Sequence, residues 1–174
     1  MKIFYALCLA FFCVGSLIAQ PNEVPQEVID DIKNDIWIPF MQAYRDTDAE
    51  KLKSIHTWDI MRITIDDNSI ETGATYLENF GGFIESIGKS DREVAIAFSI
   101  LSTAVDEHLA YQTGYYRFSS KEKGEEEFTV RGYGFFNVAL RNEVGTWKIS
   151  MDSDKRADID EEEFRRGGMV YELE

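Results

Sequence analysis

Two residues of the chain have side-chain types and a spacing that could support acid–base chemistry. His56 and Asp59 lie three positions apart, and a neutral histidine oriented by a carboxylate is a competent general base. His56 and His108 are the only histidines, and ordinary capping or surface roles are the alternative for both. The pair is therefore a candidate base whose alternative is purely structural.

A run of acidic residues further along the chain has the spacing of the ligands in a calcium-binding loop. The matching residues are Asp152, Asp154, Asp158, Asp160 and Glu163. Arg156 falls on another ligand position, where it would bring a cation toward a cation, and Ala157 replaces the glycine that makes the sharp turn. This pattern indicates a solvated acidic segment, and we expect no metal site.

Other chemistry is excluded by missing motifs and by charge. The chain has no Gly-x-Ser-x-Gly or Walker motif, and Gly132 and Gly134 fall within a strand-like run instead of ahead of a helix. Serine hydrolases, nucleotide hydrolases and Rossmann enzymes are thereby excluded, and we expect no cofactor. The 174 residues carry a formal net charge of -14, which excludes a nucleic-acid partner.

Helices come first among the elements that must position these residues. Apolar residues recur three and four positions apart over 25–44, which predicts an amphipathic helix. Pro39 predicts a kink or a break in it. Thr47 and Glu50 have the spacing of a capping box that opens a second, short helix. Residues 58–66 alternate as a strand does.

The second half of the chain changes to the period of strands. A third helix is predicted over 76–87, with Gly88 as its C-cap. Four strand-like runs follow at 93–104, 109–118, 127–141 and 146–152. Short polar segments join them, which predicts an antiparallel meander and, with the helices first, an α+β fold. We expect one domain over 20–154, followed by an acidic peripheral tail or short helix over 155–174.

Residues 1–19 have the three-part pattern of a secretory signal peptide. Lys2 supplies an early positive charge, and an uncharged apolar run and small residues follow it. We expect cleavage after Ala19, export to the periplasm or the medium, and no membrane attachment of the mature chain. A retained anchor is the alternative, although the run is short for a membrane span and lacks a basic flank. Cys8 and Cys13 lie in this segment, so the mature chain can form no disulfide.

Short motifs along this succession of elements carry a resemblance to a known superfamily. They are Phe-x-x-Ala-Tyr-x-x-x-Asp at 40–48, Gly73 ahead of the third helix, and Gly-Thr-Trp-Lys-Ile at 145–149. With the order of elements over 25–154, the chain resembles the nuclear transport factor 2-like superfamily, in its SnoaL-like branch. The resemblance implies a cone-shaped α+β barrel, in which a strongly curved antiparallel sheet wraps around the helices and encloses a pocket. Isomerases, dehydratases, cyclases and non-catalytic modules share this fold, so it does not settle function.

The resemblance identifies the positions that isomerase chemistry would need. Ketosteroid isomerases use a carboxylate base and an oxyanion hole made by a tyrosine and a protonated aspartate. The tyrosine position falls on Phe40, the aspartate position on Asn137, and the base near Thr64 or Ile65. That chemistry is therefore disfavoured. The groups left as candidates for other acid–base chemistry are Asp59, Asp66, Asp152 and His56.

The same spacing suggests which side chains line the pocket, because residues two apart share a strand face. The expected lining residues are Tyr133, Phe135, Asn137, Ser150 and Asp152 from strands, with Trp37, Phe40 and Tyr44 from the first helix. Aromatic rings with a few polar groups suit a small apolar or amphipathic molecule. The alternative is that these rings fill the cone as ordinary core.

These expectations support three hypotheses about function. The leading one is an exported domain that binds a small apolar or amphipathic ligand, as a homodimer through the outer face of its sheet, a dimer that the resemblance alone implies. The second is a lyase, isomerase or cyclase that acts on a hydrophobic substrate with a pocket aspartate as base. The third is a non-catalytic dimerising interaction module whose cone is filled.

Overall fold

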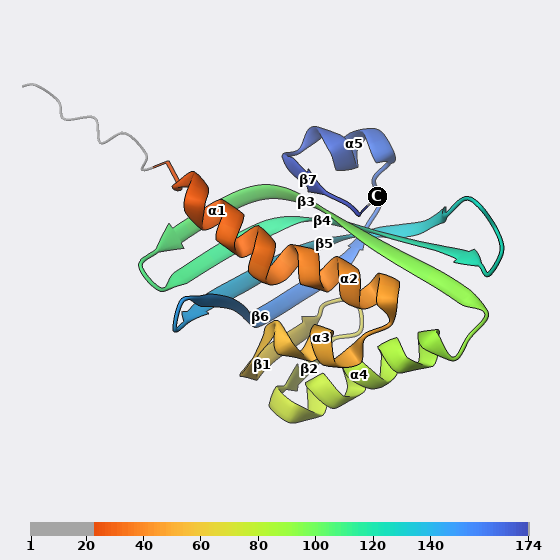
Figure 1. Cartoon of the computed structure of the whole chain (residues 1–174). Helices are drawn as coiled ribbons and strands as arrows, with labels where there is room; N and C mark the ends of the chain where they lie inside the picture. Colours follow the sequence, from red (N-terminus) through yellow and green to blue (C-terminus); the bar gives the residue numbers. More distant parts are fainter. Residues whose placement is uncertain (1–22, 174) are drawn as a thin grey trace, which may run out of the picture.

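The computed structural model describes residues 23–173 and shows a curved sheet with helices across its concave face (Figure 1). The sheet has seven strands in the order β2-β1-β6-β5-β4-β3-β7. Their bounds are β1 His56–Thr64, β2 Ser69–Thr72, β3 Arg92–Asp106, β4 Leu109–Glu122, β5 Thr129–Glu143, β6 Thr146–Ala157 and β7 Met169–Tyr171. Strands β3 to β6 form an antiparallel meander, whereas β1 runs parallel to β6. The expected α+β class is confirmed; the predicted signal peptide lies outside the described residues.

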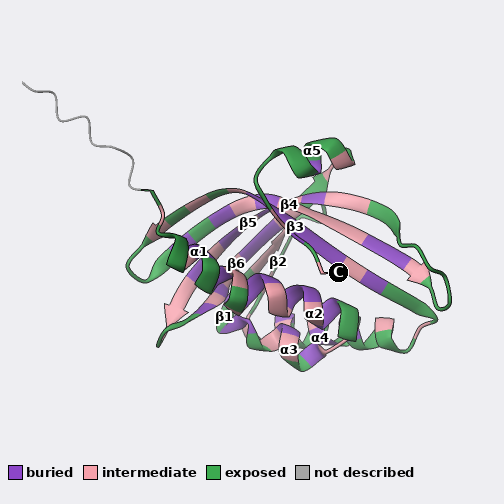
Figure 2. Ribbon diagram, turned by 45° about the horizontal axis from the view of Figure 1, so that its top comes forward, coloured by how far each residue is buried: buried purple, intermediate pink, exposed green. Residues whose placement is uncertain are grey.

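One long helical rod crosses the concave face. It consists of α1 (Gln26–Ile32), the π-helical segment η1 (Lys33–Trp37) and α2 (Ile38–Asp46), without an intervening turn. The break that Pro39 predicts is absent, because the hydrogen-bonding pattern has already changed in η1 and the proline stands in the first turn of α2, where its missing N–H is tolerated. Figure 2 shows both buried and exposed residues along the rod, and its buried residues include Ile32, Ile36 and Phe40.

Two further helices precede the meander, α3 (Ala49–Ser54) and α4 (Gly73–Gly88). The predicted capping box at Thr47 is wrong. Thr47 ends α2 in the left-handed conformation, with φ of 50°, so it is not in the extended geometry that an N-cap needs. Asp48 caps α3 in its place, since its carboxylate accepts a 2.9 Å hydrogen bond from the Lys51 backbone N–H.

The C-terminal residues contain a short helix, one of the two alternatives that the sequence predicted, and then return to the sheet. Strand β6 continues to Ala157, helix α5 (Glu161–Arg166) follows, and β7 pairs with β3. Helix α5 lies on the side of the sheet opposite the long rod (Figure 1). Phe164 is fully buried there and Tyr171 is nearly so. Two apolar anchors therefore hold a segment whose other side chains are mostly charged.

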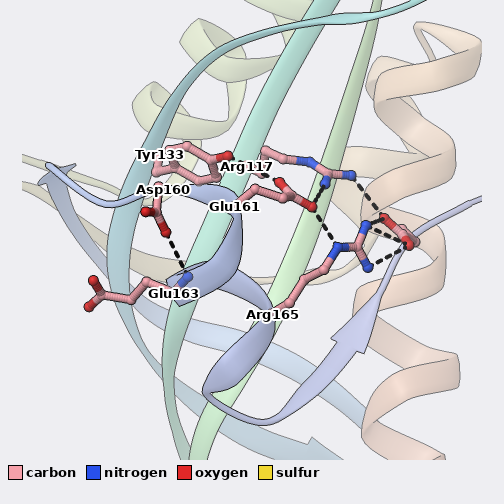
Figure 3. Close-up of polar contacts among 7 residues, drawn as sticks. Arg117, Tyr133, Asp160, Glu161, Glu163 and Arg165 are labelled. Carbon is pink, nitrogen blue, oxygen red and sulfur yellow. Dashed lines mark hydrogen bonds and ion pairs between the residues drawn. The ribbon is translucent and has the colours of Figure 1, made fainter.

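A ring of alternating charges fastens this segment to β4 (Figure 3). Arg117 contacts Glu161 and lies 2.9 Å from Glu172. Arg165 closes the ring at 2.6 Å from Glu161 and 3.2 Å from Glu172. The Arg117 guanidinium also lies over the Phe164 ring, 5.2 Å from its centroid. Burial of that ring supplies most of the attachment, because half-exposed ion pairs contribute little.

The acidic run with calcium-like spacing is divided between different parts of the fold. Asp152 and Asp154 both bond Arg62 within the protein, while Asp160 caps α5 by accepting from the Glu163 backbone N–H. Within residues 23–173 no cluster of three or more His, Cys, Asp or Glu side chains could hold a metal ion. Over the same residues, no helix has the length and apolar character to cross a membrane.

The buried ring of α5 gives a prediction about stability. Phe164→Ala should lower the free energy of unfolding by about 3 to 5 kcal/mol, because it removes a fully buried aromatic side chain. Glu162→Ala, at an exposed position of the same helix, should change it by less than about 0.5 kcal/mol. Urea unfolding of both variants measures the difference, and equal effects would show that the segment is not anchored by Phe164.

Candidate functional site

A cavity of about 550 Å³ lies between the concave face of the sheet and the helices. This volume falls in the range of small-molecule sites. Seven of its lining aromatic residues come from the helices and β3: Trp37, Phe40, Tyr44, Tyr76, Phe80, Phe83 and Phe98. Their rings contact one another at centroid distances such as 4.6 Å for Trp37 and Phe98 and 5.4 Å for Tyr76 and Phe80. Packed aromatic rings thus form much of the cavity wall.

Glycines in the sheet make room for two more rings in this space. A Cβ atom at Gly134 would lie 2.2 Å from the Tyr116 ring, and one at Gly114 would lie 2.8 Å from the Phe136 ring. Tyr116 and Phe136 both line the cavity. Only a residue without a side chain lets each ring lie flat across the neighbouring strand.

Three charged side chains form a polar cluster in the cavity wall, which we call the inner polar cluster: Arg62, Asp152 and Asp154. The Arg62 guanidinium lies 2.7 Å from each carboxylate. All three are mostly shielded from solvent, with side-chain exposures of 18%, 12% and 14%. Burial disfavours the charge on Arg62, but the two aspartates outweigh it and hold the pKa of the guanidinium above its ordinary value.

The Asp152 carboxyl group of this cluster has a raised pKa. Burial raises its pKa, Arg62 acts against that rise, and the nearby Asp154 carboxylate adds to it. The net result is a pKa above the ordinary value for aspartate. Asp152 therefore takes up a proton more readily than a solvated aspartate does, which is a property of general bases and acids.

Three tyrosines surround the inner polar cluster. Burial raises the pKa of Tyr44, Tyr76 and Tyr116, and the aspartates of the cluster add to the effect. Their hydroxyl groups therefore stay protonated and can donate hydrogen bonds. Tyr44, Tyr76 and Tyr116 all line the cavity. Their O–H groups therefore belong to the cavity wall, next to the inner polar cluster.

Some residues that the sequence placed in the pocket lie elsewhere. Trp37, Phe40, Tyr44 and Asp152 line the cavity, and so does Tyr133. The Tyr133 hydroxyl, however, donates to Glu161 of α5 at 3.1 Å. Phe135 packs on Tyr115, and Asn137 accepts from the Tyr111 hydroxyl at 2.9 Å. In this part of β5 the sequence predicted the wrong strand face, so Phe136 and Val138 line the cavity in place of Phe135 and Asn137.

An irregularity in β6 explains the placement of Ser150. The pairing of β5 with β6 shifts between Ala139 and Leu140, which leaves Ser150 as an extra residue in β6. Its hydroxyl donates to the Ala139 carbonyl at 3.1 Å, and it does not line the cavity. Because the bulge changes the alternation, Ile149 and Asp152 both line the cavity although three positions separate them.

The proposed pair of His56 and Asp59 is not formed. Residues three apart on a strand point to opposite faces, and Asp59 is exposed, where it bonds Arg141 at 2.7 Å. That ion pair lowers the Asp59 pKa. His56 is buried, with Nδ1 2.8 Å from the Leu52 carbonyl oxygen. Asp66 accepts from the Arg156 backbone N–H at 2.6 Å. Neither His56, Asp59 nor Asp66 lines the cavity.

Sequence reasoning missed Arg62, Asp154, Tyr76 and Tyr116 as cavity residues. The spacing of Asp152 and Asp154 was a usable signal, because residues two apart on a strand share a face. Arg62 gave no such signal. It becomes the neighbour of Asp152 only through the parallel pairing of β1 with β6, which joins segments far apart in the chain.

Comparison with known proteins identifies the fold. No protein-family model matches the chain, and a comparison with curated protein sequences finds no match. A conserved protein from Planctomyces limnophilus has a similar structure, with a TM-score of 0.64 and 15% identity over 78% of this chain and 100% of that one. A putative scytalone dehydratase from Novosphingobium aromaticivorans has a TM-score of 0.61 and 14% identity, over 86% of this chain and 89% of that one.

A ketosteroid isomerase-like protein from Erwinia carotovora is also similar, with a TM-score of 0.56 and 13% identity over 78% of this chain and 100% of that one. These likenesses, with the cone of curved sheet and helices, show that the chain has the nuclear transport factor 2-like fold. At such identities the likeness defines the fold and carries no activity with it.

The buried histidine predicts a pH dependence of stability. Burial lowers the His56 pKa from its ordinary 6.5 to about 4, so protonation favours the unfolded chain. The contribution is fully present above pH 6.5 and is lost as the pH falls toward 4. The free energy of unfolding should fall by about 3 kcal/mol over this window from this group.

Unfolding at several pH values, compared between the wild type and His56→Asn, separates the contribution of His56 to the free energy of unfolding from the opposite effect of Asp152. His108→Asn, which removes the exposed histidine, serves as the matched control and should keep the decrease. An NMR titration of the His56 ring in the folded wild type is independent of the variants. A midpoint near its ordinary value would contradict the burial of this ring in solution.

Proposed function

We propose that this protein binds a small amphipathic molecule in its cavity. The observation that carries the proposal is a cavity of about 550 Å³ whose aromatic wall includes three tyrosines and the charged side chains of the inner polar cluster. A core that existed only for stability would fill such space, because native interiors pack densely and satisfy their polar groups. The open volume therefore weighs against a filled, purely structural interaction module.

The chemistry of the wall defines the kind of ligand. Flat or cyclic apolar bodies pack well against rings such as Trp37 and Phe98. An oxygen atom on the ligand can accept from the Tyr44 or Tyr76 hydroxyl, and a ligand hydroxyl can donate to Asp152. Shape and apolar contact supply affinity, while these few polar groups fix the orientation.

Export and dimer formation are further parts of the proposal. The signal-like pattern of residues 1–19 supports export and cleavage after Ala19. Half-exposed side chains such as Tyr115 and Phe135 on the convex face of β4 and β5 support a homodimer through that face. Helix α5 covers the neighbouring part, so the interface we propose is the part of β4 and β5 beyond α5.

A second candidate function is a lyase, isomerase or cyclase reaction on a hydrophobic molecule bound in the same cavity. The specific observation that favours it is the raised pKa of Asp152, a carboxyl group in the cavity wall. Asp152 would act as the general base, held in place by Arg62 at 2.7 Å. Asp59 and Asp66 are not offered for this role, because neither lines the cavity.

One experiment tests the binding function and the export together. Native mass spectrometry of the protein purified from its own source should show a chain that begins at Gln20 with a small molecule bound to it. Ile96→Trp, which places a large ring in the cavity wall, should abolish the bound species. Ile70→Trp, at an exposed position of β2, is the matched control and should retain it.

The outcomes separate the candidate functions. A wild-type protein that is repeatedly free of ligand would contradict the binding function, and a full-length mass would contradict cleavage. When the identified molecule is incubated with the protein, conversion that Asp152→Asn abolishes without loss of binding would establish the catalytic alternative. Binding without conversion supports the leading function.

A further inference from the structure

The arginines of this protein divide into two groups by their partners. Among the residues that the structure describes, most arginines form an ion pair with an aspartate or glutamate: Arg45, Arg62, Arg92, Arg117, Arg141, Arg165 and Arg166. Arg131 and Arg156 form none within residues 23–173. Both of them line the cavity.

This distribution runs against the composition of the chain. The sequence has 32 acidic residues against 18 lysines and arginines, so a cationic side chain on the surface readily finds an acidic neighbour. Two guanidinium groups at one cavity that form no ion pair within residues 23–173 are therefore a local feature that the overall charge opposes, although Asp66 accepts from the Arg156 backbone N–H. Free guanidinium groups at a cavity are typical of sites for carboxylate, sulfate or phosphate groups.

The positions of the two arginines define the mouth of the cavity. Arg131 and Arg156 are exposed, whereas lining residues such as Trp37 and Phe136 are buried. The Arg131 Nε atom donates to the Ser120 hydroxyl at 2.7 Å, which orients the guanidinium and leaves its terminal nitrogens for a ligand. Both guanidinium groups therefore belong to the exposed part of the cavity lining.

The inner polar cluster cannot hold the same anion. Arg62 is engaged by both Asp152 and Asp154, so the cluster carries one net negative charge when its carboxyl groups are ionised. An anion placed there would face repulsion in a poorly solvated site. Uncharged hydroxyl groups and hydrogen-bond donors are accepted at that end, next to the Tyr44 and Tyr76 hydroxyls.

From the positive charge at the mouth and the net negative charge of the inner polar cluster, we infer that the ligand is an organic anion with a cyclic apolar body. Its anionic group stays at the mouth between Arg131 and Arg156. Its body lies along the aromatic wall, and its far end carries an uncharged oxygen group that meets the inner polar cluster. The inference rests on the proposed binding function and specifies the ligand class of that site.

Isothermal titration calorimetry with matched naphthalene probes tests this assignment. Hydroxynaphthoate carries the anion and a distal hydroxyl, and hydroxynaphthamide replaces the carboxylate with a neutral amide of the same shape. The wild type should bind hydroxynaphthoate at least about tenfold more tightly, equivalent to one charge-assisted contact. Added salt should narrow this difference, because exposed charges are screened.

Variants connect the preference to the mouth. The double variant Arg131→Gln with Arg156→Gln should lose the preference for hydroxynaphthoate and leave the affinity for hydroxynaphthamide unchanged. Lys155→Gln is the matched control, because Lys155 precedes Arg156 on the same strand, carries the same charge and does not line the cavity. It should keep the preference. Circular dichroism of each variant verifies that the fold is retained.

The possible results are distinct. Equal binding of both probes by the wild type would overturn the anion assignment and leave the binding function standing. Failure of both probes to bind would count against both conclusions. A double variant that weakens both probes by the same factor would show that the arginines only shape the mouth, which would also overturn the assignment.

Discussion

The ion pairs of Arg62 with Asp152 and Asp154 are the constraint on which the rest of the structure depends. They join β1 to β6, two strands that run parallel, through residues that lie 90 positions apart in the chain. Buried charges require partners, and removing one partner leaves the other at a cost of several kcal/mol. The cluster therefore fixes the register of β1 against the meander and places a charged, hydrogen-bonding surface inside an otherwise aromatic cavity.

The cavity persists because the two sides of the sheet are stabilised by different means. On the concave side, aromatic rings from the helical rod and the sheet contact each other, and glycines at positions 114 and 134 give two of the rings their space. On the convex side, Phe164 and the ring of arginines and glutamates hold α5 against β4 and β5. The sheet is thus supported from outside, so its concave face need not be filled completely to be stable.

Charge is distributed unevenly between the surface and the cavity. The acidic excess satisfies most arginines at the surface or within the fold, and it leaves Arg131 and Arg156 without ion-pair partners among the residues described. The high overall charge favours solubility, whereas the two arginines at the cavity are the basis of the ligand class that we propose. In that proposal, the positive charge at the mouth and the negative charge of the inner polar cluster orient the ligand.

The sequence by itself determined the α+β class, the order of helices and strands, and most element positions, because periodicity and local turn signals are properties of neighbouring residues. It also identified Trp37, Phe40, Tyr44 and Asp152 as pocket candidates. Only the tertiary structure decided the facing of β5, the bulge at Ser150, the separation of His56 from Asp59, and the partnership of Arg62 with the two aspartates. Each of these depends on strand register or on contacts between distant segments. Alternation along one strand defines two faces, and the packing of the whole sheet against the helices selects which of them is inside.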